Sequence, residues 1–182
     1  MRELILGGSR SGKSALAERR AADSGLAVTY IATARAGDPE MAARIAHHRA
    51  RRPGHWSLVE EPLQLAAVLE RHAAPGCCLV VDCLTLWLSN LLCADRDGEE
   101  PAPQALQRLE QERDALLAAL ALAPGRIVLV SNEVGMGIVP LGALTRRFSD
   151  EAGRLNQAVA AACERVTLVV AGLPYSLKEP PS

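Results

Sequence analysis

The sequence predicts an α/β fold in which an open, mostly parallel β-sheet carries helices on both faces. Short runs of apolar and β-branched residues alternate along the chain with longer stretches of helical periodicity. Several of these runs are apolar at consecutive positions, which is typical of strands that are covered on both sides. A sheet of this kind binds its ligands at the carboxyl ends of its strands.

The short apolar runs define the expected strands. In chain order they are residues 2–6, 27–33, 55–60, 77–82, 126–131 and 166–171. The clearest helix is expected over 103–123, where a proline stands at the first position and leucines recur every three or four residues. A second helix is expected over 38–52, with Asp38 as its N-cap and Pro53 ending it. Residues 95–103 are expected to form a surface loop, and 174–182 a loosely ordered tail.

Length and composition favour a single domain over residues 1–182. Of the 182 residues 49% are hydrophobic, which is enough for one substantial core. The formal net charge of −1 argues against a surface built throughout for nucleic acid or anionic lipid. The sequence shows no membrane-spanning run and no signal peptide, so we expect a cytoplasmic protein. The five cysteines form no C-x-x-C pair and are expected to be reduced core thiols rather than metal or redox ligands.

The octapeptide GGSRSGKS at residues 7–14 is a phosphate-binding motif. It fits G-x-x-x-x-G-K-[ST] and stands between an expected strand and an expected helix. Its glycines let backbone amides point at phosphate oxygens, and the following helix adds the positive end of its dipole. Lys13 supplies a charge for the β- and γ-phosphates, and the Ser14 hydroxyl can ligate Mg²⁺. The expected nucleotide contacts here are Gly7, Gly8, Ser9, Arg10, Ser11, Gly12, Lys13 and Ser14.

Three polar residues follow expected strands at the same edge of the sheet. Asp82 ends the run CCLVVD and is the expected metal anchor beside Ser14, although a residue in this position could instead cap the next helix. Asn132 and Glu133 follow the next strand along the chain. Glu133 could orient an attacking hydroxyl or the water shell of the metal, or it could cap a helix.

The helix expected over 38–52 carries two adjacent histidines that point in different directions. At about 100° per residue, His48 shares a side with Met41, Ile45 and Arg52, so it could be a packing residue. His47 lies on an arginine-rich side, where neighbouring cations keep its imidazole neutral and nucleophilic and attract phosphate. His47 could therefore attack phosphorus, or it could belong to a solvated basic face.

These segments together resemble the bifunctional adenosylcobinamide kinase / adenosylcobinamide-phosphate guanylyltransferase family of cobalamin biosynthesis. The resemblance runs through nearly the whole chain, and its segments stand in the order found in the family: GGSRSGKS, YIATA, EMAARIAHHRARRPGHW, VDCLTLWLSNLL, VSNEVGMGIVP, RRFSDEAGRLNQAVA and VVAGLPYSLK. The P-loop alone indicates only a nucleotide, whereas the histidine segment joined to SNEVGMGIVP and GRLNQ is far more specific. The resemblance implies a P-loop NTPase-type, RecA-like fold.

The resemblance also implies two reactions on one substrate. Such an enzyme phosphorylates the aminopropanol hydroxyl of adenosylcobinamide with ATP or GTP, then transfers GMP from GTP to that phosphate and releases pyrophosphate. In the family the GMP is carried by the first histidine of the pair, which here is His47. A homotrimer is implied as well. The further nucleotide contacts implied are Ala32, Thr33, Ala34, His48, Arg49, Ala50, Arg51, Glu60 and Asp82.

Two other functions stay open at this point. The chain could be a P-loop kinase for a small molecule that has no guanylyltransferase activity. The basic cluster Arg44, Arg49, Arg51 and Arg52 could instead serve a nucleotide-dependent switch that binds nucleic acid. Aromatic residues are only 3% of the chain and no nucleic-acid module surrounds the cluster, so phosphate recognition on a small molecule is favoured. Nucleic acid and membrane are not expected as partners.

Overall fold

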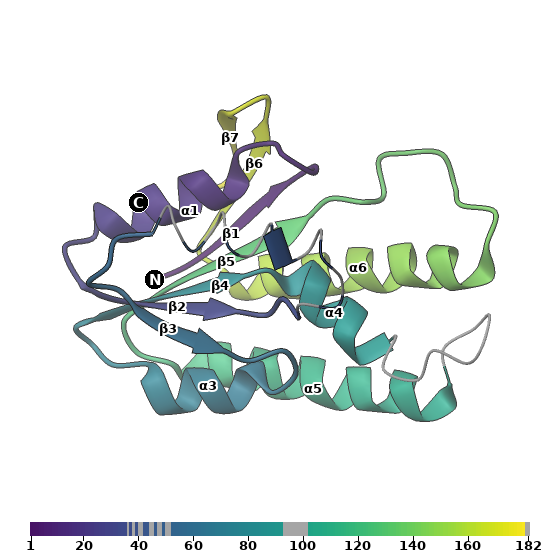
Figure 1. Ribbon diagram of the computed structural model, residues 1–182, viewed down its shortest axis with the longest axis horizontal. Helices are drawn as coiled ribbons and strands as arrows, with labels where there is room; N and C mark the ends of the chain where they lie inside the picture. Colours follow the sequence, from purple (N-terminus) through teal and green to yellow (C-terminus); the bar gives the residue numbers. More distant parts are fainter. Residues whose placement is uncertain are drawn as a thin grey trace.

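The computed structural model describes residues 1–35, 37, 39, 42–43, 46, 49, 52–92 and 102–180. Over these residues the strands form one sheet with the order β3-β2-β4-β5-β1-β6-β7 (Figure 1). All neighbouring pairs are parallel except β6 and β7, which are antiparallel. The strands are β1 Arg2–Gly7, β2 Ala27–Ala32, β3 Ser57–Glu60, β4 Cys77–Asp82, β5 Arg126–Asn132, β6 Arg165–Val170 and β7 Leu173–Lys178.

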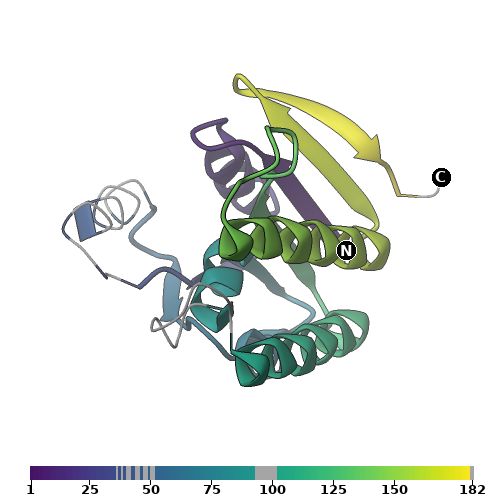
Figure 2. The ribbon, with the colours of Figure 1, turned by 90° about the vertical axis from the view of Figure 1, so that its right-hand side faces the viewer.

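Helices cover both faces of the sheet, as the sequence predicts. They are α1 Lys13–Ala22, α3 Leu65–His72, α4 Leu84–Leu92, α5 Pro103–Leu122 and α6 Ala143–Ala162. On one face, α1 packs through Leu16 and Ala17 onto strand residues that include Ile5 of β1. The neighbouring β1 residues Leu4 and Leu6 belong to the larger core on the other face, with α3, α4, α5 and α6. Figure 2 shows α5 and α6 lying alongside each other on that face. Alternate side chains of a strand point to opposite faces, which is why consecutive positions are apolar.

Five of the expected strands are found within one residue of their predicted bounds, while the expected strand 55–60 begins later, at Ser57. The helix expected over 103–123 is α5. The expectation of a loosely ordered tail is wrong for residues 174–178, because they belong to β7. A two-residue turn makes the hairpin possible: Ala171 and Gly172 have φ of 52° and 81°, values that suit a tight turn between antiparallel strands. Pro174 is tolerated because β7 lies at the edge of the sheet.

Parts of other predictions lie outside the described residues. They include most of 38–52, where the histidine helix is expected, as well as 95–101 of the expected loop and the last two residues of the chain. In the described part of the chain, no helix is long and apolar enough to cross a membrane. Cys78, Cys83 and Cys163 are buried free thiols and Cys77 is half-buried, as expected; Cys93 is outside the described residues.

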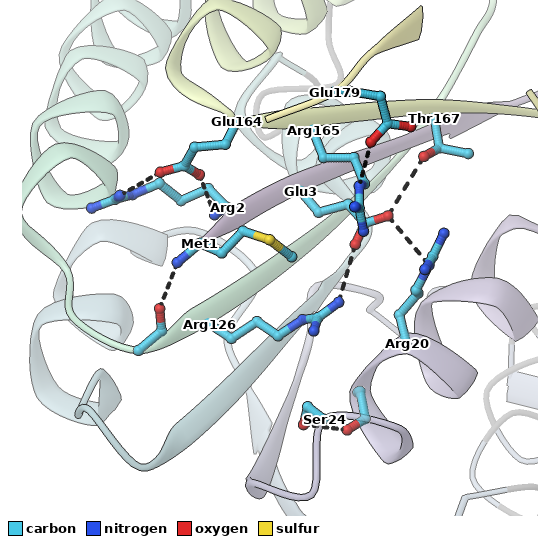
Figure 3. A network of polar contacts seen from close by, with 12 residues as sticks. Met1, Arg2, Glu3, Arg20, Ser24, Arg126, Glu164, Arg165, Thr167 and Glu179 are labelled. Carbon is cyan, nitrogen blue, oxygen red and sulfur yellow. Dashed lines mark hydrogen bonds and ion pairs between the residues drawn. The ribbon is translucent and has the colours of Figure 1, made fainter. Parts of the chain in front are cut away.

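A buried carboxylate anchors the sheet at the end opposite the P-loop. Glu3 of β1 is completely buried and lies between two arginines of neighbouring elements (Figure 3). Its Oε2 accepts a hydrogen bond from Arg126 Nη2 of β5 at 3.3 Å, and its Oε1 lies 3.6 Å from Arg20 Nε of α1. Thr167 of β6 donates a longer hydrogen bond of 3.5 Å to Oε1. The network therefore joins three adjacent strands to α1.

Candidate active site

The sheet register brings the predicted site residues to one edge. Ala32 at the end of β2 pairs with Glu60 on one side and with Asp82 on the other. Across β5, Asn132 pairs with Gly7, where the P-loop begins. Because all these strands are parallel, their carboxyl ends meet at the same edge, and the candidate site is built from strand ends as the sequence predicts.

The P-loop has the backbone conformation of an anion nest. Arg10 and Gly12 have φ of 55° and 98°, in the left-handed region that turns successive amides inward. The Ser11 amide donates to Gly8 O at 3.2 Å, and Lys13 Nζ donates to the same carbonyl at 3.0 Å. Lys13 is only 8% exposed, so its ammonium lies within the loop. This arrangement can surround a phosphate group with backbone donors and one cation.

The first turn of α1 points its amides at the loop. Gly12 is the N-cap and provides no side-chain hydrogen bond, so these amide donors remain for an anion. The Ser11 hydroxyl is buried without a hydrogen-bond partner among the described residues. Buried polar groups are normally paired, so this hydroxyl fits a site that a ligand completes. Half-buried Ser14 stands one residue into the same helix, while Gly8, Ser9 and Arg10 are exposed at the rim.

The hairpin of β6 and β7 supports the P-loop from behind, which the sequence analysis did not foresee. The Gly172 amide in the hairpin turn donates to Ser11 O at 2.8 Å. A Cβ atom at Gly7 would lie 2.6 Å from Val169 O of β6, and one at Gly12 would lie 3.3 Å from Gly172 Cα. Both glycines are therefore needed for close packing of the loop against this hairpin as well as for its backbone angles.

Tyr30 holds the carboxylate of Asp82. Its hydroxyl donates a hydrogen bond of 2.7 Å to Asp82 Oδ2, although Tyr30 itself is 3% exposed. Burial and the Asp82 charge raise the pKa of Tyr30 above its usual value, so the hydroxyl stays protonated and remains a donor. The alternative that Asp82 caps the next helix finds no support among its described contacts, which place its side chain on β2 rather than on α4.

Asp82 and Lys13 both act on the buried thiol of Cys83. Burial and the charge of Asp82 raise the pKa of Cys83 to about 11, and the charge of Lys13 acts in the opposite direction. Asp82 ends β4 and the P-loop follows β1, two strands away in the same sheet, so the carboxylate and the P-loop lie at one edge. A site for a metal-bound triphosphate needs a cation and a carboxylate at one such edge.

The donor set fits Mg²⁺ better than a transition metal. Among the described residues, no group of three or more His, Cys, Asp or Glu side chains could hold a metal ion. Mg²⁺ does not need such a cage, because it is bound through one or two protein oxygens together with substrate phosphates and water. Asp82 with Tyr30 on one oxygen, and the hydroxyl of Ser14, are oxygen donors of this kind.

Thr33, which the sequence predicts to contact the nucleotide, is buried in the structure rather than exposed at the site. It is completely buried, and its hydroxyl both donates to Cys83 O and accepts from the Cys83 amide, each at 2.8 Å. Its carbonyl accepts a 2.8 Å hydrogen bond from Asn90 Nδ2. In this structure Thr33 fastens the end of β2 to the start of α4, and a direct contact with nucleotide stays a prediction there. Ala34 is half-buried beyond it.

The central residues of the histidine segment are outside the described residues: His47, His48, Ala50 and Arg51. Two of their neighbours are described. Arg49 Nη2 forms an exposed ion pair of 2.7 Å with Oε1 of Glu60, so the segment contacts the end of β3. Arg52 stacks its guanidinium 4.1 Å from the centre of the Tyr30 ring. The partners in these contacts are Glu60, the last residue of β3, and Tyr30, which lies within β2.

A second polar group lies at the end of β5. Thr85 Oγ1 accepts a 2.6 Å hydrogen bond from the Asn132 amide, and Asn156 Nδ2 of α6 donates to Asn132 O at 3.2 Å. The Oδ1 atoms of Asn132 and Asn156 are buried without a described partner. Glu133 closes its own turn by accepting from the Gly135 amide at 2.6 Å and caps no described helix. Sequence reasoning missed Thr85 and Asn156, whose only signal is a polar side chain on the buried side of a helix.

The loop after Glu133 presents apolar side chains to solvent. The exposed large apolar residues of this loop are Val134, Met136, Ile138, Val139 and Leu141. The loop starts beside the P-loop, because the Glu133 amide donates to Gly7 O at 3.1 Å. An apolar surface next to a phosphate site is typical of a docking place for a larger molecule.

Comparison with known proteins shows the family of the chain. Residues 3–177 match the family described as cobinamide kinase / cobinamide phosphate guanyltransferase. The chain belongs to this family. It is 65% identical, over 100% of its length and 99% of the relative's, to the bifunctional adenosylcobalamin biosynthesis protein CobP of Pseudomonas aeruginosa. It is 45% identical to the protein of the same description, CobU, of Escherichia coli, over 96% of this chain and 98% of that one.

Family membership makes the chain a kinase and a nucleotidyltransferase, with cobinamide and nucleotide as substrates, as predicted. The fold is shared with a much more distant protein, an ATPase of the type III secretion system of pathogenic bacteria. That likeness has a TM-score of 0.55 at 14% identity and covers 96% of this chain and 57% of the other. The predicted P-loop NTPase-type fold is therefore confirmed.

Proposed function

We propose that both reactions use the single strand-end site described above, with GMP passing through His47. The observation that carries the proposal is the sheet register, which brings the P-loop after β1, with Lys13 on Gly8 O, and Asp82 at the end of β4 to the same sheet edge. Arg49 and Arg52 tie the histidine segment to this edge through Glu60 and Tyr30. The overall product is adenosylcobinamide-GDP, and the relatives named above are likewise described as adenosylcobalamin biosynthesis proteins.

In the kinase step, the aminopropanol hydroxyl of adenosylcobinamide attacks the γ-phosphorus of ATP or GTP. The bond between the γ-phosphorus and the bridging oxygen breaks, a nucleoside diphosphate leaves, and the hydroxyl proton passes to solvent or to a carboxylate. Lys13 and the loop amides neutralise charge on the transferred group and position it, which is most of what a protein contributes to phosphoryl transfer. Glu133 stands at this edge and is a candidate to orient the hydroxyl.

In the guanylyl step, a neutral imidazole nitrogen of His47 attacks the α-phosphorus of GTP, and pyrophosphate leaves. A phosphate oxygen of adenosylcobinamide phosphate then attacks the same phosphorus, the P–N bond breaks and the imidazole is restored. In its first step the covalent route avoids attack of a phosphate monoester dianion on the anionic α-phosphate of GTP, because the imidazole nucleophile carries no charge. Lys13 and the nest stabilise the departing pyrophosphate in this step.

Magnesium is the proposed cofactor, with Ser14 and Asp82 as its protein ligands. When bound with the nucleotide it supplies charge neutralisation on the phosphate oxygens. Of the chain's own residues, Ser14 and Asp82 would hold it, and Tyr30 keeps Asp82 in place. The nucleotide contacts proposed from the sequence, including the histidine segment, complete the site.

We also propose a cytoplasmic homotrimer. Support comes from two exposed apolar sets, the loop after Glu133 and the edge of the sheet, where Leu173, Tyr175 and Leu177 of β7 are exposed. Such surfaces are covered in assemblies more often than they are left to solvent. The corrin ring of the substrate is expected to lie mostly on aliphatic protein surface of this kind at a subunit boundary. Light scattering at micromolar concentration tests the trimer directly, and a monomer would contradict it.

The decisive experiment labels the protein with GTP that carries ³²P at the α-phosphate, in the presence of Mg²⁺. The proposal expects protein-bound label that is stable to alkali and lost in acid, as a phosphoramidate is, and a GMP adduct on His47 by mass spectrometry. His47→Ala is expected to abolish the label and His72→Ala, at a histidine of α3 outside the proposed contacts, to retain it. Label on another residue would refute the role of His47, while no label with intact kinase activity would support a kinase alone.

A further inference from the structure

Tyr30 is a buried residue that links two parts of the candidate site. Its hydroxyl donates to Asp82 Oδ2 at 2.7 Å, and the guanidinium of Arg52 stacks on its ring at 4.1 Å from the centre. The ring packs in the same cluster as Leu16 and Ala17 of α1, the helix that follows the P-loop, so it lies on the face of the sheet that carries α1. One rigid side chain thus contacts the proposed metal anchor, the end of the histidine segment and the face of the sheet that carries α1.

The two contacts on Tyr30 have different chemistry. The hydroxyl has one proton to donate and donates it to Oδ2 of Asp82, so Oδ1 is the oxygen that remains for a cation. The ring face attracts a guanidinium, and planar stacking of this kind is specific to arginine. Nothing in either contact requires Tyr30 to touch a substrate. It acts through Asp82 and through Arg52.

We propose that Tyr30 is a positioning residue that orients Asp82 for Mg²⁺ through its hydroxyl and holds the end of the histidine segment through Arg52 on its ring. The inference rests on the proposed function, because it assigns Asp82 to the metal and the histidine segment to guanylyl transfer. The hydroxyl is expected to affect Mg²⁺ binding, and therefore both reactions. The ring is expected to affect only guanylyl transfer, in which the histidine segment must reach the nucleotide.

Tyr30→Phe separates these roles, because it removes the hydroxyl and keeps the ring. The measurement is the affinity for the non-hydrolysable analogue GMPPNP, titrated with Mg²⁺ by calorimetry and repeated in EDTA. We expect the Mg²⁺ concentration that gives half of the increase in nucleotide affinity to rise about tenfold. A tenfold change corresponds to the free energy of one hydrogen bond to a charged group. Affinity in EDTA is expected to stay unchanged. Ser24→Ala removes a hydroxyl beyond the C-terminus of α1, at the end of that helix away from the P-loop; it is the control and should match the unmodified protein.

Arg52→Lys tests the stacking, because lysine keeps the charge and loses the planar group. We expect the rate of GMP adduct formation to fall about fivefold, within the range of a cation–π contact, with the Mg²⁺ titration unchanged. Arg52→Met should slow the adduct at least as much. A wild-type adduct rate in Arg52→Lys would overturn the part of the proposal that concerns the ring.

The remaining outcomes separate this inference from the proposed function. A wild-type Mg²⁺ concentration for half of the increase in Tyr30→Phe, or no effect of Mg²⁺ on nucleotide binding by the unmodified protein, would overturn the positioning role of the hydroxyl. Equal weakening of binding with and without Mg²⁺, together with a lower unfolding temperature, would show a merely structural role and would also overturn it. If the unmodified protein forms no adduct, the guanylyl mechanism is refuted. The calorimetric titration of Tyr30→Phe still tests the role of the hydroxyl independently of that result.

Discussion

Replacing Glu3 by glutamine should destabilise the protein strongly while leaving nucleotide binding intact. Glu3 is completely buried, and its carboxylate is the charge that faces the side chains of Arg126 and Arg20, which are 20% and 37% exposed. The Nε atoms of both arginines are buried without a hydrogen-bond partner among the described residues, so they depend on this charge. Glutamine keeps the shape of the side chain and removes the charge.

The size of the effect follows from the burial. Removing one partner of a buried ion pair costs about 3–5 kcal/mol, and the partial exposure of the two arginines places Glu3→Gln near the lower limit, about 3 kcal/mol. For a chain of this size each kcal/mol corresponds to about 2–4 °C. We therefore expect the midpoint of thermal unfolding to fall by about 6–12 °C. Nucleotide binding should persist at low temperature, because Glu3 lies about 13 Å along β1 from Gly7.

Urea unfolding and thermal unfolding of Glu3→Gln and Asp114→Asn measure the difference directly. Asp114 of α5 also pairs with an arginine, Arg113, at 3.2 Å, but its side chain is 69% exposed. An exposed pair contributes less than about 1 kcal/mol, so Asp114→Asn is the matched control with the same chemical change. The reasoning is refuted if Glu3→Gln shifts the midpoint no further than Asp114→Asn does. Loss of GMPPNP binding in folded Glu3→Gln would also contradict it.

Two further predictions concern the strand-end site. Gly7→Ala should lower the free energy of unfolding and abolish nucleotide binding, because the new Cβ would lie 2.6 Å from Val169 O. A Cβ at Gly8 would have no atom within 4 Å, so Gly8→Ala should leave the unfolding temperature of the nucleotide-free protein unchanged. Equal unfolding temperatures for the two variants would contradict this. Iodoacetamide at pH 8.5 should alkylate half-buried Cys77 well before Cys83, as peptide mass spectrometry can measure. The reason is that burial and the charge of Asp82 raise the pKa of Cys83 to about 11, so Cys83 stays a neutral thiol until the pH approaches that value. Faster modification of Cys83 would show that the end of β4 is open.

The architecture and much of the site could be predicted from the sequence because local patterns determine them. Consecutive apolar residues in 77–82 and 126–131 indicate strands covered on both faces, and the structure has β4 and β5 there. The P-loop could be recognised because its chemistry lies in the backbone and in adjacent residues, and the left-handed conformation at Gly12 agrees with that reasoning. Since parallel strands end at one edge, Asp82 could be placed at the same edge as the P-loop before any contact was known.

Contacts between distant segments were decided only by the tertiary structure. The short antiparallel strand β7 was missed, because its order depends on pairing with β6 and on the turn at Ala171 and Gly172. The bond from Tyr30 to Asp82 joins residues 52 positions apart, and the stacking of Arg52 on Tyr30 depends on how the histidine segment returns to β2. Periodicity reports which side of an element is buried; it carries no information about which distant polar atom satisfies a buried hydroxyl. The partner of a buried hydroxyl is decided by tertiary packing, because buried polar groups are paired with whichever polar atoms the packing brings within reach.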